Sequence, residues 1–203
     1  MKIICIGRNY AEHAKELNNA IPTEPVYFMK PDSALLIRNR PFFYPDFTSD
    51  LHYECEIVLR IGKVGKSISE KFAGSYIDAI GIGIDFTARD LQQKAKEKGL
   101  PWEKAKAFDS SAPISSFIPV TEFDDIQQID FHLTKNGETV QKSNTREMIF
   151  NYAHIISYVS QFMTLKTGDY IFTGTPSGVG PVAIGDKLEA YIADKKMLTV
   201  AIK

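Results

Sequence analysis

The sequence predicts a single strand-rich domain of the α+β class. Across 203 residues, segments with the pattern of strands outnumber helical segments, and the two kinds do not alternate regularly. This irregular order argues against a parallel sheet built from strand–helix–strand units. The pair Asn136-Gly137, between two short strand-like segments, is the strongest short-range indication of an antiparallel hairpin. At 44% hydrophobic residues, the chain can bury one substantial core.

The first part of the chain, about residues 1–50, predicts a strand, a short helix and a proline-rich segment. Residues 1–6 are mostly apolar and favour a strand, and residues 9–17 favour a helix that Asn9 can cap. Five prolines then interrupt short apolar pieces, a pattern typical of edge strands and loops: Pro22, Pro25, Pro31, Pro41 and Pro45.

The second part, residues 51–203, predicts a β-rich core that carries the metal-binding residues described below. Strands are expected at residues 51–61, 76–84, 131–134 and 139–141, and in short pieces after residue 168. Helices are expected at residues 87–98, with Thr87 as a possible cap and Gly99 as the stop, and from residue 144 to residue 162. The later helix has an apolar stripe at helical spacing, which predicts packing against the core.

Composition and charge argue against several classes of partner. The chain has 24 Lys and Arg against 25 Asp and Glu, a net charge of -1, and no long block of like charge, so nucleic acid and anionic lipid are poor candidates. Cys5 and Cys55 lie in no Cys-x-x-Cys motif, which argues against a disulfide framework or a zinc cluster. The chain also has no apolar stretch of about 18 residues, so we expect a soluble, cytoplasmic protein without a membrane partner.

Glu54, Glu56 and Asp85 are the candidate metal ligands. In a strand, side chains two residues apart point the same way, so the carboxylates of Glu54 and Glu56 share a face while Cys55 points to the other. A hard divalent cation such as Mg2+ or Mn2+ would cancel their repulsion, and Asp85, where a strand gives way to a helix, offers a third oxygen. The alternative is a pair of solvated charges on an exposed face.

His13 and Glu16 are the candidate proton-transfer pair. They lie three residues apart on one side of the first helix, so Glu16 can orient the imidazole and raise its basicity. A histidine held in this way can take a proton from water. The alternative is an ordinary solvated helix face.

Further polar residues are candidates for substrate binding, although each is a weak indication alone. Arg89 and Gln92 share one side of the helix after Asp85, and Lys106 follows some distance later. The loop at residues 173–180 offers hydroxyls and free amides that suit an anionic substrate, or is a plain hairpin loop.

Taken together, motifs along nearly the whole chain resemble the fumarylacetoacetate hydrolase family, and most closely its small single-domain branch of acylpyruvases and oxaloacetate decarboxylases. The motifs are Gly7-Arg8-Asn9-Tyr10 with His13 and Glu16, Phe28-Met29-Lys30-Pro31, residues 52–56, Asp85-Phe86-Thr87-Ala88-Arg89-Asp90, residues 99–102 and the loop at residues 173–180. The resemblance implies a mixed β roll with a short N-terminal lid helix, forming a homodimer.

The same resemblance implies roles for individual residues. Glu54, Glu56 and Asp85 would hold Mg2+ or Mn2+, and His13 and Glu16, on the lid, would be catalytic together with Lys106. Substrate would contact four residues: Arg89, Gln92, Gly174 and Thr175.

The activity that the resemblance implies is metal-dependent cleavage of a carbon–carbon bond in small 2-oxo acids. An acylpyruvate would be hydrolysed by water that His13 activates, and oxaloacetate would lose CO2, each through a pyruvate enolate. One alternative is isomerase or tautomerase activity on 2-oxo dicarboxylates such as 2-hydroxyhepta-2,4-dienedioate or oxaloacetate. Another is a non-catalytic, metal-dependent 2-oxo acid binder, against which a general base at His13 argues.

Overall fold

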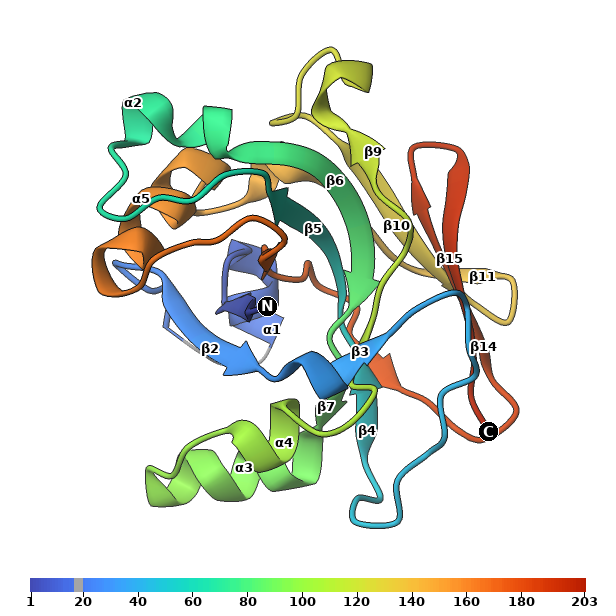
Figure 1. Cartoon of the computed structure of the whole chain (residues 1–203). Helices are drawn as coiled ribbons and strands as arrows, with labels where there is room; N and C mark the ends of the chain where they lie inside the picture. Colours follow the sequence, from blue (N-terminus) through green and yellow to red (C-terminus); the bar gives the residue numbers. More distant parts are fainter. Residues whose placement is uncertain (17–19) are drawn as a thin grey trace.

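The computed structural model describes residues 1–16 and 20–203 and shows a strand-rich fold with short helices around it (Figure 1). Its largest sheet has the strand order β2-β1-β12-β5-β6-β9, with bounds Val26–Lys30, Ile3–Gly7, Tyr170–Phe172, Cys55–Ile61, Ile77–Ile84 and Ile118–Pro119. Strands β1 and β12 run parallel, whereas the other neighbours are antiparallel. This mixed sheet confirms the predicted strand-rich α+β class.

A second, antiparallel sheet has the order β11-β10-β14-β15, with bounds Glu138–Asn144, Asp130–Lys135, Lys187–Ile192 and Lys195–Ala201. The turn between β10 and β11 confirms the predicted hairpin, because Asn136 and Gly137 both have the positive φ, 54° and 89°, that this tight turn requires. A three-stranded sheet has the order β13-β4-β7, with bounds Gly180–Pro181, Leu51–Tyr53 and Thr87–Ala88. A two-stranded sheet pairs β3 (Leu35–Leu36) with β8 (Ala112–Pro113).

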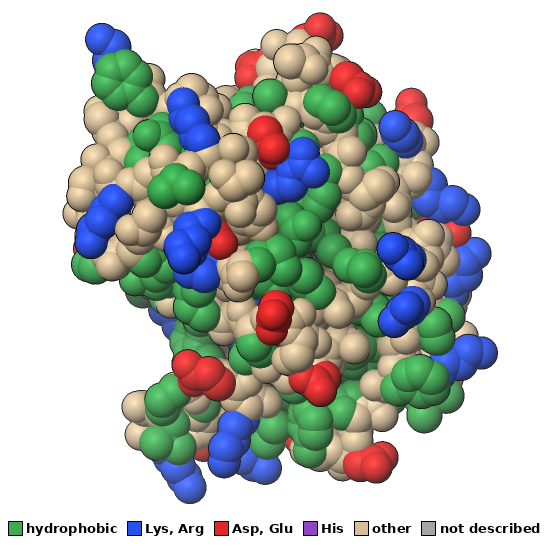
Figure 2. Space-filling model, in the orientation of Figure 1, with side chains coloured by type: hydrophobic (Ala, Val, Ile, Leu, Met, Phe, Trp, Pro, Cys, Tyr) green, Lys and Arg blue, Asp and Glu red, His purple; other side chains and the backbone are tan. Residues whose placement is uncertain are grey.

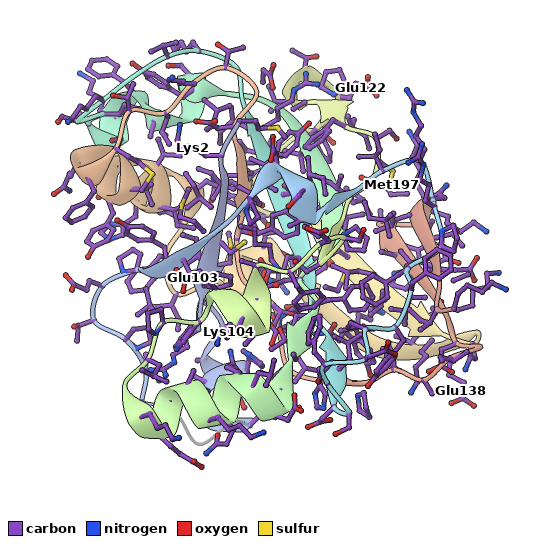
Figure 3. All side chains as sticks on the ribbon, turned by 60° about the horizontal axis from the view of Figure 1, so that its bottom comes forward. Lys2, Glu103, Lys104, Glu122, Glu138 and Met197 are labelled. Atoms are coloured by element: carbon purple, nitrogen blue, oxygen red, sulfur yellow. The ribbon has the colours of Figure 1, made fainter. Side chains whose placement is uncertain are left out.

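The helices are short and lie at the periphery. Their bounds are Ala11–Glu16 (α1), Glu70–Ala73 (α2), Arg89–Lys98 (α3), Glu103–Lys106 (α4) and Tyr152–Phe162 (α5), with 3-10 turns at Asp32–Ala34, Gly74–Tyr76, Val120–Glu122 and Thr145–Glu147. Helices α3 and α4 lie side by side at one end of the molecule in both views (Figures 1 and 3).

Several predicted boundaries differ from the structure. The predicted strand at residues 51–61 is divided at Glu54 into β4 and β5, which belong to different sheets. The helix predicted from residue 144 begins only at Tyr152, because Asn144 caps a 3-10 turn and Asn151 caps α5 through the His154 N–H. Helix α3 begins at Arg89 rather than residue 87 and ends at Lys98, with Gly99 as the stop, as predicted. The last residue of the first predicted helix, residue 17, lies outside the described residues.

The main core lies between the two larger sheets. Ile57 and Leu59 of β5 and Ile82 of β6 belong to the same buried cluster as Leu133 of β10 and Leu188 of β14. The apolar stripe of α5 joins this cluster through Ile155, Ile156 and Val159, as its spacing predicts. Packing of this kind fixes the ends of β5 and β6, where the candidate metal ligands lie.

The surface and the cysteines agree with the composition. Figure 2 shows both signs of charge spread over one face, with hydrophobic side chains between them. Cys5 and Cys55 are buried free thiols. Among the described residues, no helix combines the length and apolarity that a membrane crossing requires.

Candidate active site

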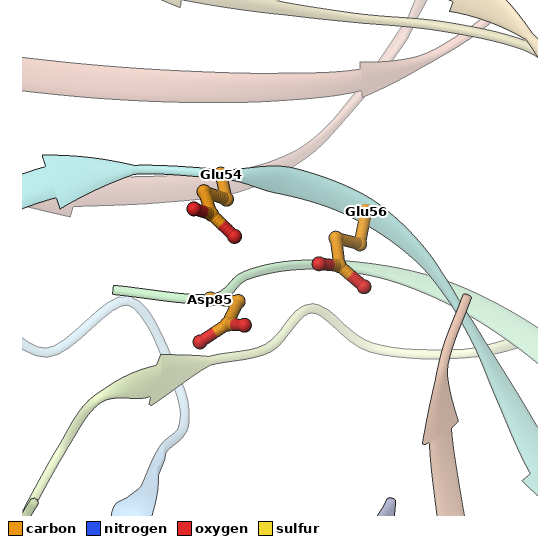
Figure 4. Close-up of side chains that lie close together, drawn as sticks. All are labelled: Glu54, Glu56 and Asp85. Atoms are coloured by element: carbon orange, nitrogen blue, oxygen red, sulfur yellow. The ribbon is translucent and has the colours of Figure 1, made fainter. Parts of the chain in front are cut away.

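Glu54, Glu56 and Asp85 converge because β5 and β6 pair side by side. Cys55 lies opposite Ile84 in this pairing, so Asp85 follows directly beside Glu54, whose carbonyl accepts the Asp85 N–H at 2.8 Å. One oxygen from each of the three carboxylates lies within 4.8 Å of the others, and all three residues are buried (Figure 4). The alternative of two solvated charges on an exposed face is therefore wrong for this pair.

Three cationic side chains pair with this acidic cluster. Lys106 Nζ donates to Glu54 Oε2 at 2.8 Å and to Asp85 Oδ2 at 2.7 Å, and Arg89 donates to Glu54 Oε1 at 2.7 Å. Lys30 Nζ lies 2.7 Å from Asp85 Oδ1, as an ion pair without hydrogen-bond alignment. The side chain of Lys30 is fully buried at the end of β2 and also donates to Ser111 Oγ and to the Lys106 carbonyl.

The two glutamates differ in the charge around them. Burial alone would raise the pKa of Glu54, but the charges of Lys106 and Arg89 lower it well below its usual value. The pKa of Glu56 is raised well above its usual value, first by burial and then by the charges of Asp85 and Glu54. The Gly174 N–H donates to Glu56 Oε2 at 2.7 Å but does not offset this.

The raised pKa of Glu56 follows from the burial of its carboxylate beside two further carboxylates. Three buried carboxylate oxygens that lie within 4.8 Å of one another are the ligand type that a hard divalent cation prefers. Such a cation would favour the ionised form of Glu56. The residues present therefore fit a divalent metal ion.

His13 and Glu16 lie on α1 and contact each other as predicted. His13 Nδ1 lies 3.2 Å from Glu16 Oε2, and Glu16 in turn accepts the Gly178 N–H at 3.1 Å. A carboxylate oxygen accepts, so Nδ1 carries the proton and Nε2 is left as the basic nitrogen. Burial lowers the pKa of His13, and the charges of Glu54 and Glu16 offset this only in part.

The loop after β12 closes the site from the side of β5. Gly174 has φ of +101°, and a Cβ there would lie 2.7 Å from Cβ of Asn9. The buried Asn9 side chain bonds to the backbone of Thr173 and Phe150 and so ties this loop to the start of α1. Thr175 Oγ1 donates to the Cys55 carbonyl at 2.9 Å, which holds the loop along β5.

One cavity brings most of the predicted site residues together. Its walls include His13, Glu54, Glu56, Asp85, Arg89, Gln92, Lys106 and Thr175. Glu16 and Gly174 lie behind this wall, in contact with His13 and Glu56.

Sequence reasoning assigned no site role to several residues that the structure places at the site, including the five named next. Arg8, Lys96 and Trp102 line the cavity, Lys30 pairs with Asp85, and Gln141 donates to Thr175 Oγ1. Among these residues, only Lys30 could have been found from its local sequence. It ends the otherwise apolar strand β2, and a buried cation needs a negatively charged partner. The other four contacts depend on segments far apart in the sequence.

The family model described as "Fumarylacetoacetate (FAA) hydrolase C-terminal" matches residues 2–203. The chain belongs to the fumarylacetoacetate hydrolase family. This confirms the resemblance that the sequence motifs indicated, and it makes the protein a member of a family of enzymes.

Relatives within the fumarylacetoacetate hydrolase family carry more than one activity. The chain is 45% identical over 190 residues to a mitochondrial oxaloacetate tautomerase of Bos taurus, covering 94% of this chain and 86% of the relative. It is 45% identical over 192 residues to a mitochondrial oxaloacetate decarboxylase of Dictyostelium discoideum, covering 94% and 88%. The crystal structure of fumarylpyruvate hydrolase from Pseudomonas aeruginosa in complex with Mn2+ and pyruvate has a TM-score of 0.95 and 37% identity, covering 100% of this chain and 89% of that one.

Proposed function

We propose that this protein is a divalent-cation-dependent enzyme that interconverts the keto and enol forms of oxaloacetate. The observation that carries the proposal is the buried cluster of Glu54, Glu56 and Asp85, which lines the same cavity as His13. The Bos taurus relative, an oxaloacetate tautomerase, supports the choice of proton transfer over the bond cleavage that the sequence motifs placed first.

The three carboxylates would hold the cation. When bound, Mg2+ or Mn2+ supplies a Lewis acid that polarises the 2-oxo group. His13 Nε2 would take a proton from the carbon beside the 2-oxo group. The electron pair of the broken C–H bond would move toward the carbonyl oxygen. Burial lowers the pKa of Lys106, but the charges of Asp85 and Glu54 raise it overall, so Lys106 keeps an ammonium that can stabilise negative charge on that oxygen. The proton taken by His13 Nε2 would then pass, directly or through water, to this oxygen, which completes the enol and returns the imidazole to its neutral form.

Substrate orientation would come from the polar wall on α3. Arg89 donates to both Glu54 and Gln92 Oε1, so its guanidinium is fixed and the amide group of Gln92 is left to donate into the cavity. Gly174 and Thr175 would support the opposite wall through Glu56 and β5.

Cleavage of a carbon–carbon bond is the second candidate. Glu16 and Gly178 hold the His13 ring in one orientation, as activation of a water molecule requires. Water would attack the distal carbonyl of an acylpyruvate, the carbon–carbon bond would break, and its electron pair would remain on pyruvate as an enolate that is then protonated. Loss of CO2 from oxaloacetate would leave the same enolate. The decarboxylase and fumarylpyruvate hydrolase relatives support this candidate.

Product-resolved NMR distinguishes these reactions and the non-catalytic alternative. Oxaloacetate, acetylpyruvate, fumarylpyruvate and an unsaturated 2-oxo dioic acid are each incubated with protein and Mg2+ or Mn2+. We expect rapid keto–enol exchange of oxaloacetate with its carbon skeleton intact; cleaved products would favour the second candidate. A protein that only binds 2-oxo acids would gain thermal stability from them without turnover. Full activity in excess chelator would contradict the proposal.

We also propose Mg2+ or Mn2+ as the cation, a homodimeric assembly and a cytoplasmic location, as the family resemblance and composition indicate. Two of the relatives are mitochondrial, so cell fractionation is the relevant test of location. Sedimentation equilibrium tests the dimer, and calorimetric titration with each cation compares their affinities.

A further inference from the structure

Two cationic side chains in the cavity wall take no part in the acidic cluster. Arg8 directly follows β1, and Lys96 lies in the last turn of α3; both line the cavity that contains Glu54 and Asp85. Within residues 1–16 and 20–203, neither side chain makes an ion pair or a side-chain hydrogen bond, unlike Arg89 and Lys106.

The charge of the cavity leaves these two cations in excess. The three carboxylates are already matched in number by Lys30, Lys106 and Arg89. Arg8 and Lys96 therefore add positive charge that no carboxylate of the cluster balances, and a divalent cation would add more. A cavity with this balance attracts an anion with more than one negative charge.

The backbone at Arg8 holds its side chain at this place at a cost. Its φ is 59°, in the left-handed region that residues with a Cβ avoid. The neighbouring Gly7 lies against Trp102, with 4.0 Å between an added Cβ and Cζ3 of the indole. Trp102 lines the same cavity. Backbone strain of this kind concentrates at functional sites, where the surrounding packing maintains it.

The environment of Lys96 agrees with an anion site. Burial lowers the pKa of Lys96, the charges of Arg8 and Arg89 lower it further, and the charge of Glu54 offsets this only in part. The three cations are therefore near enough to repel one another. A bound carboxylate would relieve this repulsion and raise the pKa of Lys96.

We propose that Arg8 and Lys96 bind a second carboxylate of the substrate and so select 2-oxo dicarboxylates over 2-oxo monocarboxylates. The inference rests on the proposed function, since Glu54, Glu56 and Asp85, with their cation, must hold the 2-oxo acid end. Phe28 and Trp102, whose rings lie 5.9 Å apart, supply the apolar part of the wall.

Calorimetric titration of the Mn2+-loaded protein tests this selection with two matched acids. 2-Oxoglutarate and 2-oxopentanoate have five carbons each and differ only in a terminal carboxylate against a methyl group. Neither carries a carboxylate placed for decarboxylation. The pair 2-oxohexanedioate and 2-oxohexanoate extends the chain by one methylene. We expect the wild type to bind the dicarboxylate of at least one pair about tenfold more tightly than the matching monocarboxylate. This is a modest difference for charge-assisted hydrogen bonds.

Arg8→Gln and Lys96→Gln should each reduce this preference, mainly by lowering the affinity for the dicarboxylate. Lys94→Gln is the matched control, because Lys94 is an exposed lysine of the same helix that lines a different groove with Leu91 and Leu100. It removes the same charge without touching the cavity and should leave the preference unchanged. Unaltered Mn2+ affinity and circular dichroism would show that the variants are folded.

Equal affinities within both pairs of acids in the wild type would overturn the inference. So would an unchanged preference in both Arg8→Gln and Lys96→Gln. If neither kind of acid binds in a cation-dependent way, the proposed function fails and this inference fails with it.

Discussion

Glu56 is the residue on which the chemistry of the site depends most directly. Its carboxylate is buried beside Asp85 and Glu54, and it accepts a hydrogen bond from the Gly174 backbone N–H rather than from a cation. Glu54, by contrast, pairs with both Lys106 and Arg89. Glu56 therefore needs either a proton or a metal ion. A substitution at Glu56 tests metal binding while leaving the fold intact.

Glu56→Gln should abolish the stabilisation of the protein by Mn2+. Glutamine keeps the size and removes the charge that repels Asp85 and Glu54, so the cation-free variant should be at least as stable as the wild type. At a cation concentration 100 times the dissociation constant, the wild type should gain about 2.7 kcal/mol, and the variant far less. Thermal unfolding with and without Mn2+ measures both.

Glu138→Gln is the control for this experiment. Glu138 is exposed at the start of β11 and lies at the periphery of the molecule, away from α3 and α4 (Figure 3). Its variant should respond to Mn2+ as the wild type does. A Glu56→Gln protein that Mn2+ stabilises fully would show that Glu56 is not a ligand.

The proton-transfer role of His13 predicts a particular pH profile. The neutral imidazole is the base, so kcat/KM should fall as pH decreases through the pKa of His13, which burial lowers below 6.5. Glu16 raises this pKa, so Glu16→Gln should move the acid limb to lower pH. Rates between about pH 5 and pH 8 measure the limb.

Glu12→Gln tests whether any shift of the limb is specific. Glu12 is an exposed residue of the same helix and bonds to Lys15. This variant should keep the wild-type profile. An acid limb that moves to higher pH in Glu16→Gln, or does not move, would contradict the assigned roles of His13 and Glu16.

At the scale of elements, the site is built where chain segments meet rather than within one of them. Strands β5 and β6 bring the three carboxylates together, and α1 carries His13. The loop after β12 contacts Asn9, which precedes α1, and Glu56 of β5. Small changes in the loop should therefore alter the metal site even when the carboxylates remain.

Gly174→Ala should weaken both the fold and Mn2+ binding. The new methyl group would lie 2.7 Å from Cβ of Asn9, and φ is +101°, so the backbone that donates to Glu56 must shift. We expect a loss of about 1–3 kcal/mol in the free energy of unfolding, measured with urea. Gly185→Ala is the control, since its φ is +98° with nothing within 4 Å of an added Cβ. Equal Mn2+ affinity in the two variants would contradict the role of the loop.

Lys30→Met should destabilise the junction between β2 and α4. Lys30 Nζ contacts Asp85, Ser111 and the Lys106 carbonyl, and its removal leaves the buried Asp85 Oδ1 without its cationic partner. Loss of one partner of a buried ion pair costs about 3 kcal/mol or more in the free energy of unfolding. Lys63→Met, at an exposed lysine that bonds to Ser75, should cost far less in the same urea titration. Equal stabilities would mean that Lys30 is dispensable.

The sequence predicted individual elements better than their boundaries. The hairpin at Asn136 and the end of α3 at Gly99 follow from local backbone requirements. The start of α5 was misplaced because Asn144 and Asn151 both act as caps, and local pattern does not choose between them. The break at Glu54 depends on pairing with β7 and β13, which no local pattern contains.

At the scale of the whole molecule, long-range pairing explains what the sequence could and could not predict. β1 lies inside the six-stranded sheet, between β2 and β12, the latter more than 160 residues away in sequence. This pairing supports our proposal that residues 1–203 form one catalytic domain. The acidic residues could be chosen from chemistry and family motifs, whereas Lys30, Arg8 and Lys96 become site residues only through the folded arrangement.

The most direct test of the central claim is calorimetric titration of the metal-free protein with oxalate, before and after addition of Mn2+. Oxalate carries the two adjacent oxygens by which a 2-oxo acid would be bound, and it is not turned over. We predict one Mn2+ per chain at Glu54, Glu56 and Asp85, and oxalate binding only when Mn2+ is present. Oxalate binding of equal strength without the cation, or no Mn2+ binding by the wild type, would contradict the account.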